Sequence, residues 1–148
     1  MHCRRKIAGV PAVAWAIGLT AALAAWYAGS LSAADAPAPR VFEMRTYVAH
    51  PGKLADLHRR FRDHTTKLFE KHGMTNIGYW TPADGPEAET TLIYILAYPS
   101  KEAREKAWKG FMDDPEWKAA YKESHKNGPL VAKVTSKFLT PTDYSAIR

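Results

Sequence analysis

The sequence is almost free of cysteine. The one cysteine, Cys3, lies near the start of the chain, so residues 35–148 have no thiol for a disulfide, a cysteine nucleophile or a cysteine-bound metal. These residues also lack a phosphate-binding glycine loop and a nucleophile elbow. The domain must therefore be held by its hydrophobic core, helped by any interface with a second copy.

Acidic residues are missing from the first 34 positions. Three basic residues at positions 4–6 precede an uncharged, mostly apolar run at residues 7–34, which ends in small residues before Asp35. This pattern predicts a secretory signal peptide over residues 1–34 and a periplasmic or secreted mature protein. An uncleaved membrane anchor is the alternative, because the run approaches bilayer thickness. The paired arginines also fit twin-arginine export.

The remaining charges are mixed in sign. Apart from positions 4–6, the chain has 18 of its 21 Lys and Arg residues against all 15 Asp and Glu residues, a net charge of +3. No basic stripe with interleaved aromatic residues is present, as nucleic-acid binding would require. The sequence predicts no nucleic-acid partner, and a membrane partner only if the first segment is uncleaved.

Hydrophobic periodicity predicts alternating strands and helices after a Pro/Ala linker at residues 35–40. The strands are predicted at residues 41–49, 74–82, 91–98 and 130–139. Helices are predicted at residues 53–72 and 101–111, with a further segment that starts at Asp114-Pro115-Glu116. On the first helix, Arg60 is placed with the basic residues of the solvated side.

This order is β-α-β-β-α-β, the ferredoxin-like arrangement of an α+β domain. It predicts a four-stranded antiparallel sheet with helices on one face. The strand at residues 91–98 is apolar on both sides, so the uncovered face needs a partner. We expect a homodimer in which two sheets face each other and close a barrel.

Four stretches, "FEMRTYVAHPGKL", "KHGMTNIGYW", "AYPSKEAREKAWKGFMDDPEWKAAY" and "SKFLTPTDYS", resemble a NIPSNAP domain over residues 41–148. The resemblance rests on E-x-R-x-Y, P-G-K-L, G-Y-W and D-P-E-W in this order. It implies a dimeric α/β-barrel fold, in a superfamily that also contains cofactor-free monooxygenases and haem-degrading enzymes. No cofactor is expected from the residues themselves.

Glu43, Arg45 and Tyr47 match the E-x-R-x-Y strand and share one side of it at period two. On the barrel hypothesis they point into the space between two sheets, where a small molecule would bind. They are candidate catalytic residues for proton transfer or for binding an anion. The alternative is that Glu43 and Arg45 form an ion pair at the dimer interface or bond a neighbouring strand.

Aromatic residues give further candidates for ligand contacts, namely Tyr79, Trp80 and Tyr94, each of which could instead be core. Trp108, Trp117 and Tyr121 can be interpreted as a binding platform or as core. His64 borders the apolar stripe of the first helix and is a fourth catalytic candidate, or a satisfied boundary histidine. The helix histidines lack i, i+4 spacing, so no metal site is predicted.

Two functions remain open. The first is an exported, dimeric NIPSNAP-domain protein that binds a small molecule or a partner. The second is a cofactor-independent monooxygenase or related enzyme that acts in the cavity between the sheets, which only the fold resemblance supports.

Overall fold

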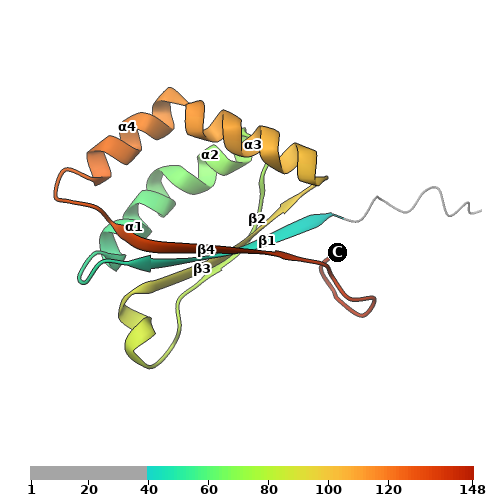
Figure 1. The fold of residues 1–148 in the computed structure, drawn as a ribbon, viewed down its shortest axis with the longest axis horizontal. Coiled ribbons are helices and arrows are strands. Elements are labelled where there is room, and N and C mark those ends of the chain that lie inside the picture. The colour runs from blue at the N-terminus through green and yellow to red at the C-terminus, as the bar shows by residue number, and fades with distance from the viewer. Residues whose placement is uncertain (1–39) are drawn as a thin grey trace, which may run out of the picture. The chain divides into compact units, whose positions relative to one another are not determined.

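The computed structural model describes residues 40–148, and within them one antiparallel sheet has the strand order β2-β3-β1-β4 (Figure 1). The strands are β1 (Val41–Ala49), β2 (Thr75–Trp80), β3 (Thr91–Tyr98) and β4 (Val131–Leu139). The helices are α1 (Leu54–Arg60), α2 (Thr66–Lys71), α3 (Lys101–Asp113) and α4 (Pro115–Ser124), with a short 3-10 turn, η3, at Pro86–Glu89. Figure 1 shows the four α-helices on one face of the sheet. The predicted α+β, ferredoxin-like fold is confirmed.

The predicted signal peptide at residues 1–34 lies outside the described residues, as does the linker up to residue 39. Among residues 40–148, no helix is both long and apolar enough to cross a bilayer.

The first helical region is not the single regular helix that the sequence predicts. A π-helical turn, η2 (Phe61–Thr65), separates α1 from α2, and Thr65 Oγ1 donates a hydrogen bond to the Arg60 carbonyl oxygen at 3.2 Å. A π turn holds more residues than an α turn, so it shifts the buried face of the helix around the axis. Arg60, predicted on the solvated side, is only 5% exposed. That prediction was wrong because it followed the charge of Arg60, whereas its position three residues after the buried Leu57 places it on the inner side of α1.

Asp114 fixes the corner between α3 and α4. One of its carboxylate oxygens accepts a hydrogen bond from the Glu116 backbone N–H at 2.8 Å, which caps α4. The other oxygen lies 2.9 Å from Lys71 Nζ and 2.7 Å from His72 Nε2, at the end of α2. These contacts tie the start of α4 to α2, and so they set where α4 lies over the sheet.

The two faces of the sheet differ in character. Tyr94 and Tyr98 of β3 are fully buried in the core beneath the helices. On the opposite face Trp80 is 50% exposed, and its indole lies against Gly78, where a Cβ atom would come within 2.5 Å of the ring. Only glycine permits this close approach of the indole to the backbone. The face of the sheet that the helices leave open therefore carries a large apolar side chain, Trp80, on the paired strands β2 and β3.

Candidate functional site

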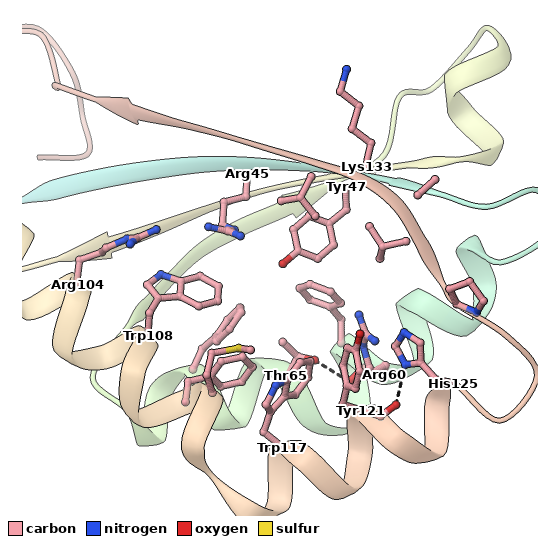
Figure 2. A pocket seen from close by; sticks show the side chains of 18 residues that line it. Arg45, Tyr47, Arg60, Thr65, Arg104, Trp108, Trp117, Tyr121, His125 and Lys133 are labelled. Atoms are coloured by element: carbon pink, nitrogen blue, oxygen red, sulfur yellow. Dashed lines mark hydrogen bonds between the residues drawn. The ribbon is translucent and has the colours of Figure 1, made fainter.

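A cavity of about 550 Å³ lies between the helices and the sheet, next to β4. Its walls come from β1, β4, the π turn and all four α-helices, and Figure 2 shows their side chains converging on it. Six aromatic side chains form most of the apolar wall: Phe61, Phe69, Trp108, Phe111, Trp117 and Tyr121. The cavity opens toward solvent near Val134 and Tyr121, which are 45% and 47% exposed. A cavity of this size and lining is typical of a small-molecule site.

The E-x-R-x-Y residues face this cavity side, not the open face of the sheet. Arg45 and Tyr47 point down from β1 into the cavity (Figure 2), and Glu43 of the same strand bonds Arg104 of α3. The expected position between the two sheets of a dimer was therefore wrong. The helices pack on the face that carries the alternating polar residues, because those residues find partners on α3.

Glu43 is the centre of a closed hydrogen-bond network. Its carboxylate is 0% exposed and accepts five hydrogen bonds. The donors are Arg104 Nε at 3.0 Å and Nη2 at 2.9 Å, Arg45 Nη1 at 2.7 Å, Tyr98 Oη at 3.0 Å and Ser136 Oγ at 2.5 Å. One buried carboxylate thereby joins β1, β3, β4 and α3. Glu43 and Arg45 form an ion pair within one chain, and Glu43 also bonds the neighbouring strand β4 through Ser136, while the predicted place of the pair at a dimer interface stays a prediction.

The network also fixes the protonation state of Glu43. Burial raises the pKa of its carboxyl group, but hydrogen bonds from Arg104, Ser136 and Arg45, together with the charge of Arg45, outweigh burial and lower the pKa to about 2. A general base needs a pKa nearer to the working pH. Glu43 is thus a fixed anion that holds two arginines in place and is poorly suited to move a proton.

Arg45 connects the network to the cavity. Besides its ion pair with Glu43, its Nε donates to Tyr94 Oη at 3.1 Å, and its guanidinium lies 4.3 Å from the ring centroid of Trp108. Among residues 40–148, nothing accepts a hydrogen bond from its Nη2 atom. Arg45 is held by Glu43, Tyr94 and Trp108, and the two N–H bonds of its Nη2 atom are left for a ligand in the cavity that Arg45 lines.

Arg60 is the second cation at the cavity and is held differently. Its guanidinium lies 5.3 Å from the ring centroid of Trp117 and 5.5 Å from that of Tyr121. Nη1 makes one long hydrogen bond to Ser124 Oγ, at 3.3 Å, and the buried Nε has no partner among the described residues. Burial lowers the pKa of Arg60, and nearby tyrosines oppose that effect. No Asp or Glu of residues 40–148 forms a salt bridge with it.

The other predicted site residues are dispersed. Tyr94 is fully buried, stacks on Tyr79 and does not line the cavity. Tyr79 donates to Asn76, and Trp80 lies on the opposite face of the sheet. His64 is exposed and lines a second, polar depression between the first helical region and α4. Arg60 borders this depression as well as the cavity, and Asp56, Asp63 and Glu123 are among its other lining residues. The structure thus brings Tyr94 together with Glu43, Arg45 and Tyr47, through its contacts with Arg45 and Tyr47, and leaves His64 and Trp80 apart from them.

Arg60 is the main residue that sequence reasoning missed. It follows Leu57 by three positions and precedes Phe61, a spacing that favours the buried stripe, but its charge favoured solvent. Trp108, Trp117 and Tyr121 all line the cavity, while Trp117 also belongs to the hydrophobic core and Trp108 packs against that core, so the platform and core interpretations both apply. Among the described residues, no cluster of three or more His, Cys, Asp or Glu side chains is placed to hold a metal ion.

Fold and cavity together define a ferredoxin-like α+β domain with a ligand-sized chamber between sheet and helices. The NIPSNAP family model matches residues 42–146, and the chain belongs to this family. A comparison with curated protein sequences gives no match.

Solved structures of other family members share this fold. A NIPSNAP family protein from Agrobacterium tumefaciens is 21% identical with a TM-score of 0.65, over 75% of this chain and 96% of that one. A second protein from the same organism is 23% identical with a TM-score of 0.64, over 74% and 99%. A NIPSNAP-like domain protein from Burkholderia xenovorans is 20% identical with a TM-score of 0.63, over 73% and 90%.

Proposed function

We propose that this protein is an exported, homodimeric NIPSNAP-domain protein whose cavity binds a small molecule. The cavity carries the proposal. Its volume of about 550 Å³ falls in the range of small-molecule sites, its walls are largely aromatic, and a few polar groups converge on it. The Glu43 network supports the same function, because it holds Arg45 rigidly at the cavity wall.

Filling the mouth of the cavity tests this function. In a Val134→Trp variant the new indole occupies the opening, and the neutral fluorescent probe N-phenyl-1-naphthylamine should bind at least about tenfold more weakly than to the wild type, since it loses most of its buried contact area. Titration of probe fluorescence gives both affinities.

The matched control is Lys122→Trp, which adds the same side chain to an exposed position of α4 outside the cavity. This variant should bind the probe as the wild type does. Equal binding by Val134→Trp and the wild type, or no binding by the wild type, would contradict a ligand site in this cavity.

The homodimer is supported by the open face of the sheet. Trp80 is half exposed there, and Ile93 and Ile95 of β3 are only partly covered within one chain. Such a face gains free energy by pairing with a second copy of itself. Export is supported by the charge pattern of residues 1–34.

Native mass spectrometry of the full chain, expressed in a Gram-negative host and purified from the periplasm, tests both proposals. We expect a mature chain that begins at Asp35 and a mass of two such chains. A full-length chain in the membrane fraction would contradict cleavage and favour the anchor. A monomer mass at micromolar concentration would contradict the dimer.

The alternative function, a cofactor-independent monooxygenase, receives less support from the site. The low pKa of Glu43 makes this carboxylate a weak proton acceptor, and His64 lies outside the cavity. Of the candidate proton-transfer residues, only Tyr47 lines the cavity. Binding is therefore the function that the geometry supports best.

A further inference from the structure

The charges around the cavity are unbalanced. No Asp or Glu is among the described residues that line it. Arg45 and Arg104 both pair with Glu43, and Arg104 also pairs with the exposed Glu105, so the charges of this group balance. Arg60 is the positive charge that has no salt-bridge partner within residues 40–148. The Lys133 side chain points away from the cavity (Figure 2), so the excess comes from Arg60.

A buried cation without a carboxylate is unusual, because removing an arginine from water costs several kcal/mol unless a partner compensates. The rings of Trp117 and Tyr121 offset part of this cost. They do not complete the hydrogen bonds, since Nε is buried without an acceptor among the described residues. A native protein with such an atom needs a reason to retain it.

Another arginine of this domain shows that the Nε and Nη2 edge of a guanidinium can bind a carboxylate. Arg104 grips the two carboxylate oxygens of Glu43 through Nε at 3.0 Å and Nη2 at 2.9 Å, the parallel pair of N–H groups. On Arg60 the same pair, Nε and Nη2, has no acceptor among residues 40–148, while Nη1 is used by Ser124. Arg60 therefore presents a carboxylate-binding edge that lacks a carboxylate.

We propose that the cavity binds a small organic carboxylate with an aromatic or flat apolar body, and that Arg60 binds its carboxylate group. This inference rests on the proposed function, for which it names the ligand class. The ring of Tyr121, which is 47% exposed and lies over the guanidinium, moves aside when the carboxylate reaches Nε. The apolar body then packs against the aromatic wall formed by Trp108, Phe111 and Trp117.

The π turn contributes to this arrangement. It begins directly after Arg60, and Thr65 at its end is bonded to the Arg60 carbonyl oxygen. π turns often occur at functional sites. Phe61, the first residue of the turn, and Arg60, the residue before it, both line the cavity, one as an apolar contact and the other as the anion site.

The test compares two probes of nearly equal shape, 2-naphthoate and 2-naphthalenemethanol, by isothermal titration calorimetry at pH 7.5. The wild type should bind the acid at least about tenfold more tightly than the alcohol, because a charge-assisted hydrogen bond to a buried arginine is worth that much. In Arg60→Met the acid should lose at least about tenfold in affinity and the alcohol less than about threefold. Arg60→Lys keeps the charge but not the paired N–H groups. Its affinity for the acid should lie between those of the wild type and Arg60→Met.

Arg59→Met is the matched control, because Arg59 is the adjacent arginine but is exposed and paired with Asp56. It should keep the preference of the wild type for the acid. Equal affinity of the wild type for acid and alcohol would overturn the carboxylate assignment and leave the cavity function intact. An acid preference that persists in Arg60→Met would overturn the role of Arg60. Failure of both probes to bind the wild type would contradict the proposed function itself.

Discussion

Replacing Glu43 with alanine is expected to lower the free energy of unfolding by about 3–5 kcal/mol at neutral pH, the usual cost of removing one partner from a buried ion pair. The change removes five hydrogen bonds at once. It also removes the carboxylate shared by the guanidinium groups of Arg45 and Arg104, which are 13% and 19% exposed, and Arg45 then has no acidic partner within residues 40–148. Urea denaturation at a fixed protein concentration measures the loss.

Glu105→Ala is the control for this prediction. Glu105 also pairs with Arg104, at 3.0 Å, but it is 72% exposed, so its removal should cost less than about 1 kcal/mol. A loss of similar size in both variants would show that the buried network contributes no more than a surface pair.

Acid should reproduce the effect of the Glu43 substitution. The pKa of Glu43 is lowered from 4.5 to about 2 in the folded protein. The stabilisation from its ionised carboxylate is therefore complete above about pH 4.5 and is lost as the pH falls toward 2. The difference in the free energy of unfolding between the wild type and Glu43→Ala should therefore decrease as the pH falls from about 4.5 toward 2.

Replacing Arg60 with methionine should have the opposite sign and stabilise the ligand-free protein. Methionine fills a similar volume and removes a buried charge that has no acidic partner within residues 40–148. Exchange of buried charges for apolar side chains commonly gains about 1–4 kcal/mol. We expect the lower part of this range, because the contacts with the rings of Trp117 and Tyr121 are lost.

The free energy of unfolding without added ligand decides this prediction. Arg59→Met, at an exposed neighbouring position, should change it by no more than about 0.5 kcal/mol. A destabilised Arg60→Met would mean that Arg60 is retained because it holds α1 to α4. If Arg60→Met is more stable than the wild type but binds 2-naphthoate and 2-naphthalenemethanol equally well, then Arg60 lowers the stability of the ligand-free protein and is retained for binding the carboxylate.

The fold could be predicted from local patterns. The strands at Val41–Ala49 and Thr91–Tyr98 have the predicted bounds, since β-branched and apolar residues run up to sharp Pro and Gly breaks. The start of a new helix at Asp114-Pro115 could also be predicted, because the N-cap Asp114 and the proline in the first turn favour a helix start through local contacts alone. These signals depend on neighbours in sequence, which a single chain displays directly.

The site could be predicted only in part. The polar side of β1 was evident, but alternation alone does not say which layer will cover it. That choice depends on Arg104 and Ser136, which lie 61 and 93 residues away from Glu43. The burial of Arg60 involves Trp117 and Tyr121 of α4, which lie 57 and 61 residues further along the chain. Sequence patterns carry little information about such long-range partners.

In this small domain, the residues that hold the sheet and helices together at Glu43 differ from the exposed residues at the edge of the cavity that would contact a ligand. The signature strand is committed to holding the layers together, so a change there would disturb the whole molecule. The exposed residues Tyr121 of α4 and Val134 of β4, at the edge of the cavity, are not part of the Glu43 network. Evolution can thus retune what the chamber accepts by altering these residues, while the motif that identifies the family stays unchanged.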